Sequence, residues 1–183
     1  LCLSLLLLLI ISYFNPTAKE RIIDLTFKQM NLFNKEKENK KIIIFTETHT
    51  HHYISAYKMF LDNQVIGVGV KNFRNFCDDE KYKKPFSCST HPHNTYLQIL
   101  AETGAIGFLF LVFILFYFCK YVTKHAYLKF KGKEFFSDFE ICLLSGILLY
   151  LWPFVPTGSI FNNWLNIIIY LYFPFLTWKR KVN

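Results

Sequence analysis

The chain has 183 residues, and 52% of them are hydrophobic, including 21 Phe, 11 Tyr and 3 Trp. This apolar share is too high for a surface in contact only with water, so the composition excludes an ordinary soluble domain. The formal net charge of +8 would by itself suggest a nucleic-acid partner. However, eight of the 21 Lys and Arg residues lie in two short segments that follow apolar runs. This distribution is typical of a membrane protein, so we expect no nucleic-acid binding.

Four apolar runs lie near residues 1–14, 96–119, 139–155 and 160–178. A helix needs about 20 apolar residues to cross a hydrocarbon core of about 30 Å. The first run has no initiator methionine and no preceding basic residues, so we expect a truncated transmembrane helix and not a signal peptide. The predicted fold class is therefore all-α: a fragment of a polytopic membrane protein with a large external loop and three C-terminal transmembrane helices.

The basic residues also predict the orientation. Eight of the 21 Lys and Arg residues lie at 120–133 and 179–181, and none lies at 156–163, so the first two segments should be cytoplasmic and the third external. The basic residues of the long segment before residue 92 do not count against this, because long loops translocate largely regardless of charge. The predicted order is a truncated transmembrane helix (1–14), a large external loop (15–92), a transmembrane helix (93–120), a cytoplasmic loop (121–137), a transmembrane helix (138–155), a short external loop (156–162), a transmembrane helix (163–178) and a cytoplasmic tail (179–183).

Within the large loop, an Asn-Pro pair at 15–16 predicts the start of an amphipathic helix. Residues 42–45 predict a short strand, and 52–61 a second helix. Gly67 and Gly69 follow that helix. A dinucleotide site would need a strand before such glycines and a helix after them, so tight turns are the preferred interpretation.

Two cysteines of the external loop, Cys77 and Cys88, are separated by ten residues. Disulfides are typical of compartments outside the cytoplasm, and a ring of this size is stabilised by about 3 kcal/mol in the chain-entropy description. We therefore expect a disulfide, with two free thiols as the alternative.

The most informative stretch begins with His93 and Asn94 at the outer end of a predicted membrane helix. The N-terminus of a helix attracts anions, and a histidine there can titrate near neutral pH. Glu102 lies more than two turns further along, and an acid at that depth is expected to pair with a basic residue. In the alternative interpretation, His93 and Asn94 only cap the helix, while Gly104 and Gly107 allow close helix packing.

This stretch resembles the signature of the O-antigen ligase and polymerase superfamily. There, His-Asn is followed by nine residues and Gly-x-x-Gly, at the start of a membrane helix that follows a large periplasmic loop. His93, Asn94, Gly104 and Gly107 match this pattern, and the resemblance extends to the glycine turn at 67–73. It implies a multi-pass protein of the bacterial inner (cytoplasmic) membrane, with the large loop in the periplasm.

The resemblance implies an inverting, metal-independent glycosyltransferase without a cofactor, acting in cell-surface polysaccharide biosynthesis. The donor would be a lipid-linked oligosaccharide on undecaprenyl diphosphate, the acceptor lipid A core or another glycan, and membrane lipid the surroundings. This fragment alone is expected to be inactive. His93 would be the catalytic base. The residues expected to bind substrate are Arg74, Lys71, Asn94 and His91, and those expected to be structural are Glu102, Gly104, Gly107, Cys77 and Cys88.

Three alternatives remain open at this point. An O-antigen polymerase or a protein O-oligosaccharyltransferase would share the same signature. Relatives commonly carry an arginine in the region where this chain has His49, His51 and His52, so that arginine cannot be assigned here. Those histidines, together with His91 and His93, could instead bind a metal, although their spacing matches no familiar zinc signature. A membrane transporter fragment would use an intramembrane acid as a pathway residue.

Overall fold

The computed structural model describes residues 6–7, 10–11, 13–25, 28 and 45–182. The regular elements of this part are helices without a strand, which confirms the all-α prediction there. Most of the strand predicted at 42–45 lies outside the described residues. The chain divides into two units, residues 1–50 and 51–183, and each is described by itself.

The first unit contains the short helix α2 (Pro16–Lys19) and the π-helix η1 (Glu20–Asp24). The side-chain oxygen of Asn15 accepts a hydrogen bond from the backbone N–H of Ala18 at 3.1 Å, and Pro16 opens the helix. The predicted helix start is therefore confirmed. Residues 6–7, 10–11 and 13–14 are also helical, and the truncated membrane span at 1–14 stays a prediction.

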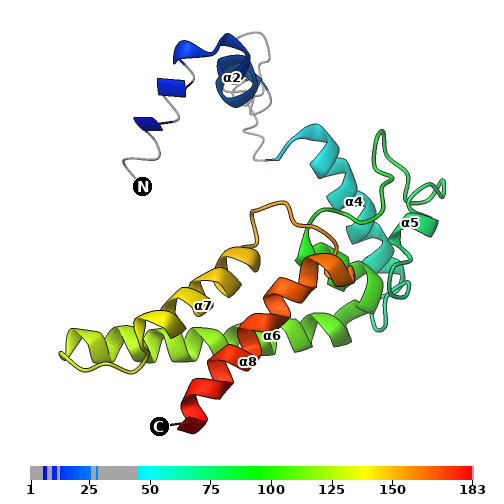
Figure 1. The fold of residues 1–183 in the computed structure, drawn as a ribbon. Coiled ribbons are helices and arrows are strands. Elements are labelled where there is room, and N and C mark those ends of the chain that lie inside the picture. Colours follow the sequence, from blue (N-terminus) through cyan, green and yellow to red (C-terminus); the bar gives the residue numbers. More distant parts are fainter. Residues whose placement is uncertain (1–5, 8–9, 12, 26–27, 29–44, 183) are drawn as a thin grey trace. The chain divides into compact units, whose positions relative to one another are not determined.

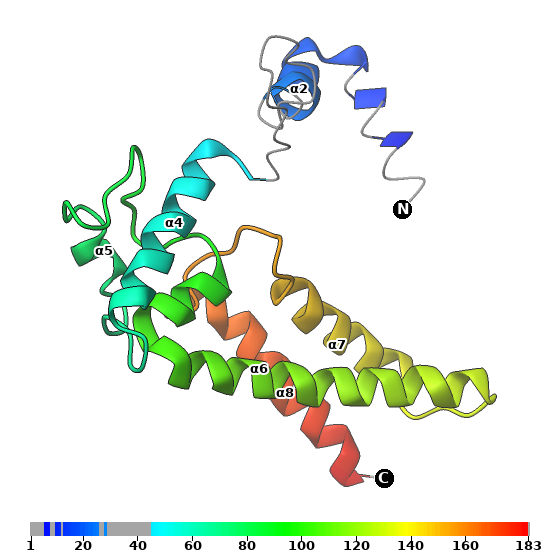
Figure 2. The same cartoon turned by 180° about the vertical axis from the view of Figure 1, so that it is seen from behind.

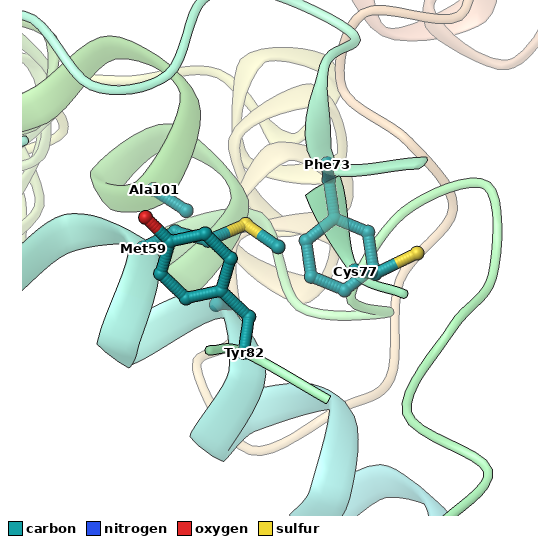
Figure 3. Packing of buried hydrophobic residues seen from close by; sticks show 6 residues of the cluster. Met59, Phe73, Cys77, Tyr82 and Ala101 are labelled. Carbon is teal, nitrogen blue, oxygen red and sulfur yellow. The ribbon is translucent and has the colours of Figure 1, made fainter. Parts of the chain in front are cut away.

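Helices α4 (Glu47–Asp62) and α5 (Phe73–Phe76) form the part of the large loop that packs against the start of the next helix. The predicted helix at 52–61 is confirmed, and it begins earlier than expected. Buried apolar side chains from both elements form one cluster (Figure 3), whose members are Ala56, Met59, Phe73, Cys77, Tyr82 and Ala101. Because Ala101 belongs to the long helix that follows, this cluster fixes the loop on that helix.

The predicted disulfide is confirmed. Cys77 and Cys88 are bonded, with their Cα atoms 4.9 Å apart. Cys77 is fully buried in the apolar cluster. The bond therefore ties the hairpin of residues 78–87 to the core of the loop.

Three helices follow in the chain: α6 (Thr95–Phe130), α7 (Asp138–Tyr150) and α8 (Asn163–Val182) (Figures 1 and 2). Within the described residues, α6 is the one helix long and apolar enough to cross a membrane. It extends past the predicted span end at 120. Helix α7 has 13 residues, fewer than the roughly 20 that a span needs, so three C-terminal spans remain a prediction.

Helices α6, α7 and α8 share a second apolar cluster. Its buried members Phe118, Phe136, Leu144 and Ile147 come from α6, the α6–α7 connection and α7, and α8 adds Tyr172 and Leu176. A capping box starts α7, because the Ser137 hydroxyl and the carboxylate of Glu140 each accept the other residue's backbone N–H. This bundle holds the start of α8 near the start of α6.

Candidate functional site

The long helix α6 is interrupted at Gly104, where the backbone is not helical (φ 65°, ψ −160°). Two hydrogen bonds of the helical ladder are opened there, and the segment 64–69 supplies the replacement partners. Four hydrogen bonds join the two segments: Ala105 N–H to Gln64 O (2.7 Å), Ile106 N–H to Val65 O (3.3 Å), Val68 N–H to Ala101 O (2.9 Å) and Gly69 N–H to Glu102 O (3.0 Å). All four opened groups of the helix are thus satisfied.

The two glycines at this joint are required by close backbone contact. A Cβ atom on Gly67 would overlap the backbone of Glu102, and one on Gly104 would overlap the carbonyl of Val65. Both glycines also have positive φ. Gly104 was expected to be structural, with close helix packing as the alternative interpretation, and its close neighbour is the backbone of the loop. A Cβ atom on Gly107 would meet the Thr103 side chain of its own helix.

Glu102 is fully buried, and its carboxylate accepts three hydrogen bonds. One oxygen accepts from the backbone N–H of Phe73 at 3.0 Å. The other accepts from the backbone N–H of Lys71 at 3.0 Å and from the side-chain amide of Gln98 at 3.2 Å. The expectation of a basic partner is therefore wrong, because these N–H groups compensate for the burial of the carboxylate. Glu102 fixes the segment that carries Lys71 and Arg74 onto α6.

The connection between α7 and α8 lies against the start of α6 and makes several hydrogen bonds there. Thr157 donates its backbone N–H to the carbonyl of His93 (3.0 Å), and its own carbonyl accepts from Nε2 of His91 (3.2 Å). Its hydroxyl is 2.9 Å from that of Thr95. The sequence analysis missed this role, although a Thr-Gly-Ser sequence between apolar runs was a signal for it.

Asn94 is the N-cap of α6, as the alternative interpretation of the motif predicted. Its side-chain oxygen accepts from the backbone N–H groups of Tyr96 (3.0 Å) and Leu97 (3.1 Å). Its amide donates to the carbonyl of Pro153 at 2.9 Å. Asn94 is nearly buried, and both ends of its side chain hold the start of α6 and the α7–α8 connection together.

His93 lies between two other imidazoles directly before that cap. Its ring centroid is 4.2 Å from that of His91 and 5.3 Å from that of His52 on α4. Its φ of 57° is in the left-handed region, which is strained for a residue with a side chain. The structure thus joins the predicted residues His91 and His93, and it adds His52, which the sequence analysis considered only as a metal ligand.

A hydrogen bond to a carbonyl group holds His91 in one tautomer. The Thr157 carbonyl can only accept, so Nε2 of His91 carries the proton, while Nδ1 is 2.9 Å from the hydroxyl of Thr90. Burial lowers the pKa of His91, the hydrogen bond to Thr157 opposes this, and electrostatic interactions with His52 and Arg74 lower it further. His91 is therefore expected to be neutral near pH 7.

The two predicted cationic residues differ in their placement. Arg74 is an exposed residue of α5, and its charge reaches the histidine group, because it contributes to the lowered pKa of His91. Lys71 is exposed with a positive φ of 61°, and its backbone N–H is bound by Glu102. Arg74 is therefore the better placed of the two for contact with a ligand at His93.

Within the described part of the chain, no group of three or more His, Cys, Asp or Glu side chains is arranged to hold a metal ion. The hydrogen bonds of the loop histidines agree with this. Nδ1 of His49 is 2.7 Å from the hydroxyl of Thr46, and Nδ1 of His51 is 2.7 Å from the carbonyl of Pro85. The alternative of a metal site therefore receives no support from these residues.

The sequence model of the O-antigen ligase family matches residues 1–112. This range includes α4, α5, the histidine group and the kink of α6. Comparisons with curated proteins and with solved structures gave no match. The family is one of bacterial membrane proteins with glycosyltransferase activity in polysaccharide synthesis. More than half of the chain is matched, and the chain therefore belongs to the O-antigen ligase family.

Proposed function

We propose that the protein transfers a glycan from undecaprenyl diphosphate to an acceptor hydroxyl, with lipid A core as the preferred acceptor. Membership of the family supports glycosyl transfer in general. The observation that carries the assignment of roles is the placement of His93, half-buried between two imidazoles at the N-terminus of α6. His93 is the base in this proposal.

The reaction needs one proton to be removed and one anion to be stabilised. The imidazole of His93 takes the proton of the acceptor hydroxyl, whose oxygen attacks the anomeric carbon of the donor sugar. The bond from that carbon to the phosphate oxygen breaks, and the pyrophosphate leaves with the electron pair. Attack opposite to the leaving group inverts the sugar carbon. A positioned base of this kind contributes roughly 100- to 10,000-fold to the rate.

Arg74 is proposed to stabilise the departing pyrophosphate. A guanidinium group pairs well with phosphate oxygens, and the charge of Arg74 already acts on His91 beside the base. The N-terminal end of α6 adds a favourable dipole for an anion. Lys71 would act as a second cation at longer range.

His91 and Asn94 are proposed to act mainly by placing the base. Each lies within two residues of His93, and each is hydrogen-bonded to the α7–α8 connection through Thr157 or Pro153. Thr157 also binds the backbone carbonyl of His93. These bonds fix the left-handed backbone of His93 from both sides, so the imidazole is held for proton transfer before the substrate arrives.

In the proposed membrane arrangement, α6, α7 and α8 cross the bacterial inner membrane and the large loop lies in the periplasm. The length and apolar character of α6 support this. In that orientation the basic end of α6 is cytoplasmic. The histidine group then lies at the periplasmic end of α6, where a carrier pyrophosphate at the membrane surface is accessible.

The decisive experiment is complementation of cells that lack the gene, followed by gel analysis of surface glycans and of carrier-linked glycan. His93→Ala should abolish transfer at normal protein level and membrane insertion. His51→Ala, a change at another loop histidine, is the matched control and should complement. Near-normal transfer by His93→Ala would overturn the assignment of the base.

The same gels distinguish the acceptors. Loss of all polymer from lipid A core, with carrier-linked polymer accumulating, supports the ligase. Core molecules that carry a single repeat would show an O-antigen polymerase instead. An unchanged surface pattern with loss of glycan from proteins would show a protein O-oligosaccharyltransferase.

A further inference from the structure

His52 is the one residue of the histidine group that comes from α4. It is 4% exposed, and its ring centroid lies 5.3 Å from that of His93 with the ring planes tilted by 45°. His91 lies near His93 at 4.2 Å between ring centroids. The base of the proposed reaction is therefore held between one ring from its own segment and one ring from a helix about 40 residues earlier in the sequence.

The orientation of His52 is set by the disulfide-bonded hairpin. Its Nδ1 is 2.7 Å from the backbone carbonyl of Ser87. Since a carbonyl oxygen can only accept, Nδ1 carries the proton, and in the neutral ring Nε2 is the acceptor. Ser87 is 1% exposed, its hydroxyl accepts the N–H of Lys84 at 2.8 Å, and its neighbour Cys88 is bonded to Cys77.

We propose that His52 is a positioning residue: it holds the imidazole of His93, the base, in its reactive orientation. Through His52, the disulfide-bonded hairpin supports catalysis. The inference rests on the proposed function only in that it takes His93 as the base. His52 does not need to contact substrate in this role. A histidine with a carbonyl group on Nδ1 has a fixed tautomer and ring plane, and a fixed ring packed against a second ring restricts that ring.

The proposal also predicts an electrostatic effect of His52 on His93. Among the described contacts of His93 are the rings of His52 on α4 and of His91 in its own segment, and the charge of Arg74 on α5 acts on His91. Neighbouring imidazoles disfavour simultaneous protonation. Removal of the His52 ring should therefore change the pH at which His93 becomes protonated.

Two variants of the full-length protein separate the features of His52. His52→Asn keeps a donor for the Ser87 carbonyl and removes the ring, whereas His52→Phe keeps a ring and removes the donor. His51→Asn is the matched control, because His51 donates to the carbonyl of Pro85 in the same hairpin at the same distance of 2.7 Å. Transfer is measured in membranes, with carrier-linked glycan extracted from cells that lack the gene.

Both His52 variants should lower kcat by on the order of 10- to 100-fold, with KM for the carrier-linked glycan changed by less than about threefold. His51→Asn should leave both constants unchanged. The Cys77→Ser, Cys88→Ser double variant should lower kcat to a similar extent, and adding His52→Asn to it should cause little further loss. A wild-type kcat in both His52 variants would overturn the proposal.

A second measurement does not depend on transfer. Diethyl pyrocarbonate modifies unprotonated imidazoles, and mass spectrometry gives the modification rate of His93 as a function of pH. The midpoint should shift in His52→Asn and stay unchanged in His51→Asn. An unchanged His93 profile in His52→Asn overturns the inference while the proposed function stands. An active His93→Ala variant overturns the assignment of His93 as the base, and the role of His52 in placing that base falls with it.

Discussion

The two parts of α6, before and after Gly104, are both helical but have opposite surroundings. In the first part, polar side chains are buried: Thr95 and Gln98 are 1% exposed and Glu102 is 0% exposed. In the second part, large apolar side chains point outward, as Leu109 at 65% and Phe116 at 70% exposure show. Hydrogen bonds to two loops therefore fix the first part, whereas the second part presents an apolar surface of the kind that lipid covers.

One continuous apolar run in the sequence can therefore contain a part that packs on loops and a part that presents a lipid-type surface. The predicted span at 93–120 treats the whole stretch as membrane helix. The structure assigns its beginning to the loop and its histidine group, because the polar side chains there bind Lys71, Phe73 and the α7–α8 connection.

Gly104→Ala should be the most damaging change. The new Cβ would overlap the carbonyl of Val65, and φ is positive, so we expect a loss of about 2–6 kcal/mol from overpacking and strain together. The matched control is Gly132→Ala, where φ is also positive but no atom lies within 4 Å of the new Cβ. Thermal unfolding of the purified proteins measures both. Equal stability of the two variants would contradict the close joint.

A pair of leucines tests the second part of α6. Leu111 is 6% exposed and Leu109 is 65% exposed. Leu111→Ala should cost about 2–5 kcal/mol, because it leaves a cavity at a buried position. Leu109→Ala should cost less than about 1 kcal/mol, because lipid tails replace the lost contacts. Unfolding in lipid nanodiscs gives the comparison, and similar losses at both positions would show that Leu109 also packs against protein.

Glu102→Gln tests the hydrogen bonds that join the first part of α6 to the loop. The amide keeps one acceptor oxygen but turns its NH2 group toward an N–H donor of the loop. We therefore expect the free energy of unfolding to fall by about 2 kcal/mol. Hydrogen exchange should become faster at the amides of Lys71 and Phe73, which donate to this carboxylate. Glu134→Gln, at an exposed ion pair with Lys129, is the control and should leave these amides protected.

The pH dependence of stability should reveal His91. Its pKa in the folded protein lies below the ordinary value of 6.5, so the unfolded chain binds more protons as the pH falls below that value. The stability that His91 contributes is complete above pH 6.5 and is lost as the pH falls through its folded-state pKa. Tm measured from pH 8 to 5 should fall less in His91→Gln, which keeps a donor for Thr157. An unchanged slope would contradict a neutral His91.

Much of the fold could be predicted from local patterns. The Asn15 cap, the helix after residue 50 and the Cys77–Cys88 disulfide are confirmed, because capping, periodicity and loop closure are encoded within short stretches. The His-Asn motif was singled out for another reason, its resemblance to the family signature, and the role of His93 stays a proposal.

The contacts that complete the site could not be predicted in this way. His52 and Thr157 reach His93 from elements far away in the sequence, and no local pattern specifies such pairs. A glycine in an apolar run is typical of helix packing, so the contact of Gly104 with the loop was not foreseen. The prediction of a basic partner for Glu102 was wrong, because its carboxylate is bound by backbone N–H groups. Every residue but proline has such a group, so the sequence gives no sign of which ones will bind.

The joint at Gly104 has a mechanical consequence. The carbonyls of Ala101 and Glu102 and the N–H groups of Ala105 and Ile106 can pair with one another, as in any straight helix, or with the segment 64–69, as observed. If that segment were to detach, the helix could close its own ladder and water could solvate the segment. Release of the loop would therefore leave no backbone group of α6 without a hydrogen-bond partner.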